Sequence, residues 1–452
     1  MAEFFLEEIC LATNGKTDYR GTLKFSGVST DTRTIKPGDL FIALSGERFD
    51  GHHYVKQAIE QGAAGAVVSR KVDAPAGACI VETADTLKAL QALARLHRQR
   101  FSIPVIAITG SNGKTTTKDM LAAVLGQKLS VLKTEANFNN EIGLPLTLLK
   151  LTAGHQAAVV EMGMRGLGEI AELAAIALPT VGIVTNVGET HIERLGSMEA
   201  IAAAKAELPQ ALPADGIAVL NYDNDFVKDM ETKTAARVVF FGLQQAAAVR
   251  AEAVRSGDQV EFTCCFSGGE FSVTLPVPGK HNVYNALAAI SVGLALGLTP
   301  ADISLGLATF SSGAMRLSIE SKGSYTVIND AYNASPLSME AAIHTLAEVA
   351  RARKVAVLGD MLELGEFAAA AHQTVGRRLA ESKVDAVVAV GPHSVHIAET
   401  AAKSGVPQAW HYETHEAAVA KLSEILLPGD TILVKGSRGM QMEQILTLLK
   451  LA

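Results

Sequence analysis

Short apolar runs alternate along the chain with segments in which apolar residues recur at helical spacing. Residues 103–108, 157–163 and 181–187 are runs rich in β-branched residues, which predict buried strands. Residues 118–125 and 198–208 carry apolar residues at helical spacing. Repeated strand-then-helix units predict a mostly parallel sheet with helices on both faces, because parallel strands need a crossover connection.

The same alternation continues toward both ends of the chain. Three strands around a helix over 53–61 are predicted near the N-terminus, at 39–44, 64–68 and 79–81. Beyond a weak break at 311–313, strands are predicted at 325–329, 354–358, 385–390 and 431–434.

We therefore predict an α/β protein with three domains. Residues 1–84 form a small N-terminal α/β domain. Residues 85–313 form a central domain with a mostly parallel sheet, opened by an amphipathic helix over 85–100 and closed by a β-rich stretch over 238–275. Residues 314–452 form a C-terminal Rossmann-like α/β domain.

Composition and charge exclude several classes of protein. A chain of 452 residues with 48% apolar residues and 39 glycines is typical of a globular protein with several cores. A net charge of −7 without a lysine- or arginine-rich tract argues against nucleic acid as the main partner. The apolar stretch 283–298 is interrupted by Asn285, so it predicts a core helix rather than a membrane span. The acidic N-terminus and four cysteines without zinc spacing predict a reduced, cytoplasmic protein.

A phosphate-binding loop is predicted at residues 109–116, T-G-S-N-G-K-T-T, between a buried strand and a helix. Glycines let successive backbone N–H groups converge, and the helix N-terminus adds partial positive charge, so the loop can hold a polyphosphate. Lys114 would add a point charge and Thr115 a hydroxyl for Mg²⁺. The spacing G-x-x-G-K-T is shorter than the usual form, because Ile108 stands where the first glycine would fall.

Further polar groups follow other predicted strands of the chain. Glu161 ends one strand and His191 lies shortly after another, so both should share the sheet edge with the phosphate loop. Lys205, in an apolar helix, would by default be a surface lysine. Arg316, Lys435 and Arg438 are spare cations that could bind phosphate or carboxylate. The loops at 30–33 and 46–51 predict either turns or a ligand site.

Taken together, residues 109–115, Glu161, His191, Lys205 and the stretch 281–285 (H-N-V-Y-N) closely resemble the Mur ligases, the ATP-dependent amide ligases of peptidoglycan precursor synthesis. The resemblance covers essentially the whole chain. Three further stretches, 134–145, 330–334 and 435–443, resemble the member of this family that adds D-alanyl-D-alanine to UDP-N-acetylmuramoyl-tripeptide. The D-N-P-R motif of the ligase that adds the third residue does not occur in the sequence.

The resemblance implies a role for each matching residue. ATP would bind Gly110, Ser111, Asn112, Gly113, Lys114, Thr115 and Thr116, with Asn282 and Asn285 near the adenine and Arg316 and Asp330 on the far side. Thr115 and Glu161 would hold one Mg²⁺ and His191 a second, and Lys205 matches a lysine that CO₂ carbamylates. The first domain would take the UDP end, with Thr30, Asp31 and Arg33 as candidates. Asn137, Asn139 and Asn140 would line the substrate channel, and Tyr332, Asn333, Lys435, Ser437 and Arg438 would serve D-alanyl-D-alanine.

The implied reaction passes through an acyl phosphate on the tripeptide, catalysed by Lys114, Glu161, His191, Lys205 and Arg316 in a monomer that binds neither nucleic acid nor membrane. Other functions stay open from the sequence. They are a sister Mur or folylpolyglutamate-type ligase, a phosphate-loop ATPase switch or motor, and a non-catalytic nucleotide-binding module.

Overall fold

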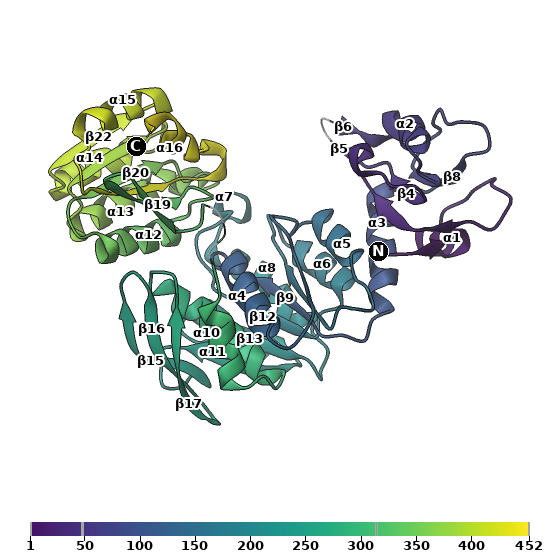
Figure 1. Cartoon of the computed structure of the whole chain (residues 1–452), viewed down its shortest axis with the longest axis horizontal. Helices are drawn as coiled ribbons and strands as arrows, with labels where there is room; N and C mark the ends of the chain where they lie inside the picture. The colour runs from purple at the N-terminus through teal and green to yellow at the C-terminus, as the bar shows by residue number, and fades with distance from the viewer. Residues whose placement is uncertain (1, 47–48, 312, 314, 451–452) are drawn as a thin grey trace.

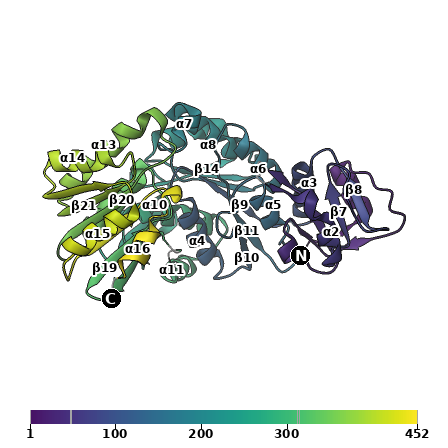
Figure 2. The same cartoon turned by 90° about the horizontal axis from the view of Figure 1, so that it is seen from above.

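Three sheet-centred units lie in series along the molecule in a computed structural model that describes residues 2–46, 49–311, 313 and 315–450. A four-stranded sheet lies at one end, a nine-stranded sheet in the middle and a six-stranded sheet at the other end (Figures 1 and 2). The predicted break at 311–313 and the start of the third domain at 314 fall partly on Ser312 and Ala314, which lie outside the described residues.

The N-terminal unit is built on a parallel sheet in the order β3-β4-β7-β8. Helix α3 begins after Asp85, whose carboxylate caps it, and packs on this unit through α1 and on the central unit through α5 and α6. The elements of this unit are β1 (Phe4–Phe5), α1 (Leu6–Thr13), β2 (Lys24–Phe25), β3 (Gly27–Ser29), η1 (Thr32–Thr34), β4 (Asp39–Ile42), β5 (Ser45–Gly46), β6 (Phe49–Asp50), η2 (Gly51–Tyr54), α2 (Val55–Glu60), β7 (Gly65–Val68) and β8 (Cys79–Glu82). Helix α3 (Thr86–Gln99) lies between this unit and the central one.

The central sheet has the order β10-β11-β9-β12-β13-β14-β15-β16-β17 and is parallel from β10 to β15, with β16 and β17 antiparallel. Its strands are β9 (Val105–Thr109), β10 (Val131–Lys133), β11 (Ala157–Glu161), β12 (Val181–Val184), β13 (Ile217–Asn221), β14 (Arg237–Gly242), β15 (Val249–Ser256), β16 (Val260–Phe266) and β17 (Gly269–Leu275). Its helices are α4 (Lys114–Leu125), α5 (Gly143–Leu148), α6 (Glu169–Ala177), α7 (Ile192–Leu195), α8 (Met198–Gln210), α9 (Asp225–Lys228), η3 (Asp229–Lys233), α10 (His281–Ala295) and α11 (Pro300–Ala308).

Helices cover both faces of the central sheet, as predicted. Val105 and Ala107 of β9 belong to the core shared with α3, α5, α6 and α8, whereas Ile106 and Ile108 belong to the core shared with α4, α10 and α11. This alternation follows from the period of two in a strand, and it explains why the run is apolar without interruption. The apolar stretch 283–298 is a core helix, because most of α10 is buried.

The C-terminal sheet has the order β18-β19-β23-β20-β21-β22 and is parallel except for β18. Helices α12, α13 and α14 share one core with it, and α15 and α16 share another. Its elements are β18 (Ser318–Lys322), β19 (Tyr325–Asp330), α12 (Pro336–Val349), β20 (Lys354–Gly359), η4 (Gly365–Phe367), α13 (Ala368–Glu381), β21 (Ala386–Val390), α14 (Val395–Ser404), β22 (Gln408–Tyr412), α15 (His415–Ile425), β23 (Thr431–Lys435), η5 (Arg438–Met440) and α16 (Glu443–Leu449).

The strands that the sequence pattern did not predict are short or lie toward sheet edges, among them β10, β18 and β22. Such strands carry mixed polar and apolar residues, because one side faces solvent. Within the described ranges, no helix combines the length and the apolar character needed to cross a membrane.

Candidate active site

The predicted phosphate loop leaves the C-terminal end of β9 and enters α4 at Lys114. Gly110 and Gly113 have φ angles of +147° and +83°. A side chain at Gly113 would also collide with the amide of Asn285 on α10. Both glycines are therefore required by the backbone conformation, as a loop with converging N–H groups demands.

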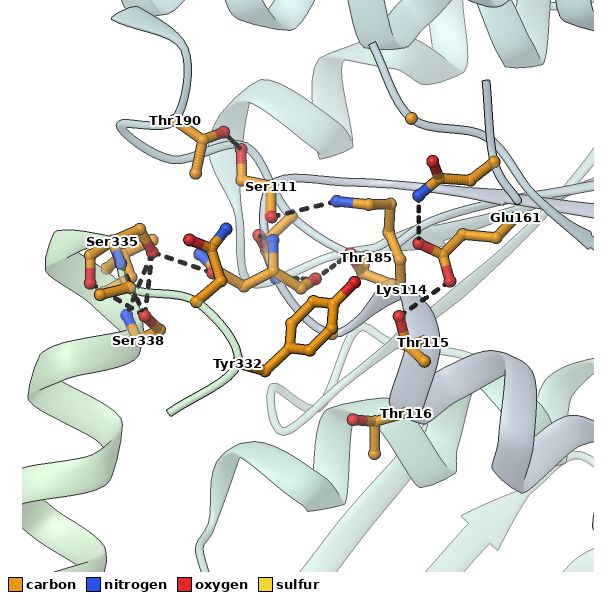
Figure 3. A pocket seen from close by; sticks show the side chains of 18 of the residues that line it. Ser111, Lys114, Thr115, Thr116, Glu161, Thr185, Thr190, Tyr332, Ser335 and Ser338 are labelled. Carbon is orange, nitrogen blue, oxygen red and sulfur yellow. Dashed lines mark hydrogen bonds between the residues drawn. The ribbon is translucent and has the colours of Figure 1, made fainter. Parts of the chain in front are cut away.

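Lys114 folds back over its own loop (Figure 3). Its Nζ donates to the carbonyl oxygens of Gly110 at 2.6 Å and Ser111 at 3.2 Å. Burial lowers the pKa of Lys114, and the nearby carboxylate of Glu161 opposes that shift. The cation thus lies at the centre of the loop, where an incoming phosphate would replace the carbonyl oxygens as its partner.

Residues just after β12 hold the backbone of the phosphate loop. The backbone N–H of Asn112 donates to Oδ1 of Asn186 at 2.9 Å, and the Nδ2 of Asn186 donates to the carbonyl of Asn112 at 3.1 Å. Thr185 Oγ1 donates to the same carbonyl at 2.6 Å. The hydroxyl of Ser111 donates to the carbonyl of Gly188, on the loop that leads to His191. These contacts fix the loop before any ligand arrives.

Glu161 ends β11 and is buried beside the loop, with 3% of its surface exposed. Its Oε2 accepts from Thr115 Oγ1 at 2.8 Å (Figure 3). Its Oε1 accepts from Asn139 Nδ2 at 2.8 Å. The pair joins a hydroxyl and a carboxylate, both hard oxygen donors of the kind that Mg²⁺ prefers.

His191 lies at the N-terminus of α7 with a left-handed φ of 58°. Its Nδ1 is 2.5 Å from Oε2 of Glu363, which comes from the C-terminal unit, and this contact lowers the pKa of Glu363. Nowhere in the described part of the chain do three His, Cys, Asp or Glu side chains cluster closely enough to hold a metal on their own.

Lys205 is not the surface lysine that its apolar helix would suggest by default. It lies on α8 with 2% of its surface exposed. Burial lowers the pKa of Lys205 well below its ordinary value, and the charge of Lys114 lowers it further. Burial and the neighbouring cation therefore both favour the neutral form of this amine over its charged form.

Asn282 and Asn285 lie on the first two turns of α10, against α4. Asn285 Oδ1 accepts from Thr117 Oγ1 at 3.2 Å, and its Nδ2 donates to Oδ1 of Asn282 at 3.0 Å. The Nδ2 of Asn282 donates to the carbonyl of Pro278 at 2.8 Å. Both amides are buried and oriented by these contacts.

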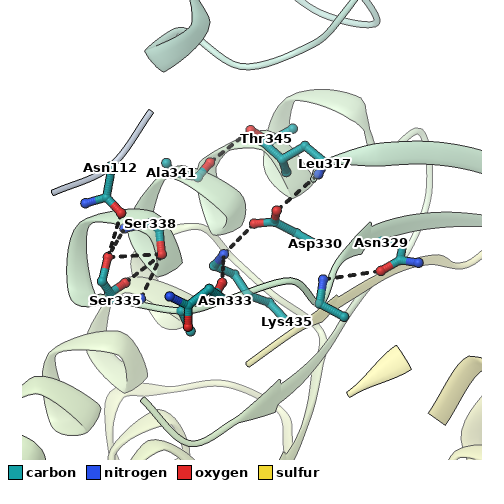
Figure 4. A network of polar contacts seen from close by, with 12 residues as sticks. Asn112, Leu317, Asn329, Asp330, Asn333, Ser335, Ser338, Ala341, Thr345 and Lys435 are labelled. Atoms are coloured by element: carbon teal, nitrogen blue, oxygen red, sulfur yellow. Dashed lines mark hydrogen bonds and ion pairs between the residues drawn. The ribbon is translucent and has the colours of Figure 1, made fainter. Parts of the chain in front are cut away.

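The three cations predicted to bind phosphate or carboxylate differ in their surroundings. Lys435 ends β23 and forms a buried ion pair with Asp330 at 2.5 Å, while also donating to the carbonyl of Asn333 at 2.8 Å (Figure 4). Arg438 pairs with Glu443 at 2.8 Å. Arg316 instead stacks its guanidinium 3.8 Å from the centre of the Tyr332 ring. The parallel strands β19 and β23 are neighbours, so their acidic and basic ends meet.

One cavity of about 970 Å³ brings most of the predicted site residues together. It is lined by the phosphate loop, Glu161, His191, Lys205 and the asparagines 137, 139 and 140 from the central unit. From the C-terminal unit it receives Arg316, Asp330, Tyr332, Asn333, Lys435, Ser437 and Arg438. The N-terminal candidates do not line it: Asp31 caps the short helix η1 and pairs with Arg33 at 2.6 Å. Residues 47 and 48 of the second predicted N-terminal loop lie outside the described residues.

The sequence analysis missed several contributors to the site, among them Thr185 and Asn186 described above and two residues of the C-terminal unit. Glu363 reaches His191 from the loop after β20, and Ser335 reaches the phosphate loop from the start of α12. Ser335 precedes a proline and begins an apolar-periodic segment, so the helix cap could have been found. No local signal marks Glu363, because its partner lies 172 residues away.

Family models match the chain in three places. They are described as "Mur ligase family, catalytic domain" over residues 24–100, "Mur ligase middle domain" over 108–293 and "Mur ligase, glutamate ligase domain" over 315–438. With the relatives described next, these matches show that the chain belongs to the Mur ligase family, whose members are ATP-dependent amide ligases.

Within that family, the chain is similar to ligases of one particular kind. It is 40% identical to the UDP-N-acetylmuramoyl-tripeptide–D-alanyl-D-alanine ligase of Bacillus subtilis, over 97% of this chain and 96% of that protein. Its fold matches the crystal structure of MurF from Acinetobacter baumannii with a TM-score of 0.93 and 33% identity, covering 100% and 99% of the two chains. MurF from Thermotoga maritima, solved in complex with ADP, matches with a TM-score of 0.84 and 29% identity over 94% and 97% of the chains.

Proposed function

We propose that this chain is an ATP-dependent ligase that joins D-alanyl-D-alanine to UDP-N-acetylmuramoyl-tripeptide. The products are the UDP-linked pentapeptide precursor of peptidoglycan, ADP and phosphate. The observation that carries this proposal is the single cavity lined by a phosphate loop, a buried lysine, a loop of asparagines and the polar strand ends of the C-terminal unit. A nucleotide, an acceptor and an amine can therefore meet in one place.

The reaction has two steps. The terminal carboxylate of the tripeptide attacks the γ-phosphorus of ATP, and the bond between that phosphorus and the oxygen that bridges it to the β-phosphate breaks. ADP departs, and the tripeptide now carries an acyl phosphate. The amine of D-alanyl-D-alanine then attacks the acyl carbon, and phosphate leaves as the amide forms and the amine loses a proton. Lys114 and the N–H groups at the start of α4 bind the phosphates, and closure of the C-terminal unit over the cavity keeps water from the acyl phosphate.

Two Mg²⁺ ions fit the donor groups around the phosphate loop. Thr115 Oγ1 and Glu161 Oε2, 2.8 Å apart, would hold one ion, and His191 would hold the second. Because no cluster of three acidic, His or Cys side chains occurs among the described residues, phosphate oxygens and water would complete each coordination sphere. When bound, Mg²⁺ neutralises charge on the phosphates.

Lys205 would be carbamylated. Its neutral amine attacks CO₂, the new C–N bond leaves a carboxylate, and the amine releases one proton. Burial beside Lys114 supports this, because the modification replaces a buried, repelled cation by an anion that Lys114 and Mg²⁺ can stabilise.

The remaining substrate contacts follow the division into three domains, 1–84, 85–313 and 314–452. The first domain binds the UDP end through Thr30, Asp31 and Arg33, and Asn137, Asn139 and Asn140 line the path of the peptide. Asn282 and Asn285 contact the adenine, with Arg316 and Asp330 on the opposite side. The third domain binds D-alanyl-D-alanine through Tyr332, Asn333, Lys435, Ser437 and Arg438. We further propose that the protein acts in the cytoplasm as a monomer.

The test is phosphate release from ATP and Mg²⁺ with the UDP-linked tripeptide and D-alanyl-D-alanine, added singly and together. We expect release only when both are present, matched by one pentapeptide per phosphate. Steady release without either substrate would favour a phosphate-loop switch and overturn the ligase proposal.

A further inference from the structure

A hydrogen bond joins the phosphate loop to the C-terminal unit. Ser335 Oγ, at the N-terminus of α12, donates to Oδ1 of Asn112 at 2.9 Å (Figure 4). Among the described residues this is the only hydrogen bond between residues 110–116 and residues 315–450. The two residues are 223 positions apart in the chain. Both line the cavity that we assign to the nucleotide.

The Asn112 end of this contact is rigid. Its backbone N–H and carbonyl are both held by Asn186, and Thr185 holds the carbonyl as well. Only the side chain of Asn112 is therefore free to respond to a ligand. Its Nδ2 is buried without a hydrogen-bond partner among the described residues. A phosphate oxygen entering the loop would supply the missing acceptor.

Ser335 lies next to the residues that we propose bind D-alanyl-D-alanine. Ser335 is 6% exposed, and its hydroxyl also caps α12 through the backbone N–H of Ser338. It directly follows the loop in which the carbonyl of Asn333 accepts from Lys435 and the carbonyl of Ala334 accepts from Ser437. One short segment therefore connects the phosphate loop to the strand end that carries Lys435.

We propose that Ser335 is a positioning residue for the ligase reaction. Through Asn112 it sets the distance between the two walls of the nucleotide site, and through the 330–335 loop it places the amine-binding end of the C-terminal unit against the phosphates. This inference rests on the proposed function for the identity of the second substrate. The contact itself requires only that the loop binds a nucleotide.

The test compares variants that separate this contact from helix capping. Ser335→Gly removes the hydroxyl but keeps the cap nearly intact, because glycine is tolerated at that position. Ser335→Thr keeps both functions. Ser256→Ala is a matched control, because Ser256 on β15 donates to Glu348 at the other end of α12 at 2.6 Å, so it too joins the central and C-terminal units.

The measurement is the calorimetric Kd of an ATP analogue with a non-hydrolysable β,γ bridge, with Mg²⁺ present. We expect Ser335→Gly to raise Kd about threefold to tenfold, the range for losing one buried hydrogen bond. Ser335→Thr and Ser256→Ala should stay within about twofold of the wild type. The double variant Asn112→Ala/Ser335→Gly should bind no more weakly than Asn112→Ala alone, because both changes remove one interaction. The KM for D-alanyl-D-alanine should rise in Ser335→Gly and not in Ser256→Ala.

An unchanged Kd in Ser335→Gly, or an equal loss in Ser256→Ala, would overturn the proposal. A wild-type chain that binds the analogue but makes no pentapeptide would overturn the ligase assignment instead, and the comparison of Kd values would still decide the role of Ser335.

Discussion

Replacing Asp330 by asparagine should destabilise the C-terminal sheet, because it leaves the cation of Lys435 buried without its counter-ion. Lys435 is 3% and Asp330 13% exposed at the side chain, and their charged atoms are 2.5 Å apart. Burial raises the pKa of Asp330, and Lys435 opposes that rise. Removing one partner of a buried ion pair costs about 3–5 kcal/mol. Asparagine and the carbonyl of Asn333 can still accept from Lys435, so we expect a loss of about 2–4 kcal/mol.

The assay is urea unfolding followed by the fluorescence of Trp410. This is the only tryptophan in the chain, and it lies on β22 of the same sheet. Lys435→Met is the matched control, since it removes the cation and keeps an apolar stem. The double variant Asp330→Asn/Lys435→Met should be more stable than Asp330→Asn by at least about 1.5 kcal/mol. A loss below about 1 kcal/mol for Asp330→Asn, or strictly additive losses in the double variant, would refute this account of the pair.

Three further predictions concern the cavity. Lys205→Ala should lower ligase activity about 10- to 100-fold, the range seen when a group that supports a metal site is lost, and added short carboxylic acids should restore part of the activity. Full activity of this variant without added acid would contradict the proposal that Lys205 is carbamylated. Gly113→Ala should weaken ADP binding about tenfold, because φ is +83° and the new Cβ would meet Asn285, and an unchanged calorimetric Kd would count against this reading of the loop. Burial and the charge of Lys435 lower the pKa of His281 to about 4, so the unfolded chain binds more protons between that pH and about 6.5. The free energy of unfolding should therefore fall by at most about 3 kcal/mol as the pH is lowered through this window. The melting temperature of His281→Gln should fall less than that of the wild type over the same pH range. Parallel profiles of melting temperature against pH would show that His281 does not cause the loss.

The sequence pattern was sufficient where the signal is local. A strand, a glycine turn and a helix that are contiguous in the chain can be recognised together, so the loop at 110–116 and its flanking elements β9 and α4 were predicted correctly. The rule that ligands gather at the carboxyl ends of parallel strands also predicted that Glu161 and His191 would reach the loop. Arg98 near the end of α3 has a structural role, since it donates to four backbone carbonyls, among them that of Ala177.

By itself, then, the sequence determined the α/β class, the repeated strand-and-helix units, the phosphate loop and the family resemblance. Each of these depends on residues that are near one another in the chain or on a period along it. Only the tertiary structure decided which charges are paired and which polar groups are buried. The pairing of Lys435 with Asp330, the burial of Lys205 and the contact of Ser335 with Asn112 join residues from separate elements. Such contacts depend on how sheets and helices pack in space, and the periodicity of residues along the chain does not predict that packing.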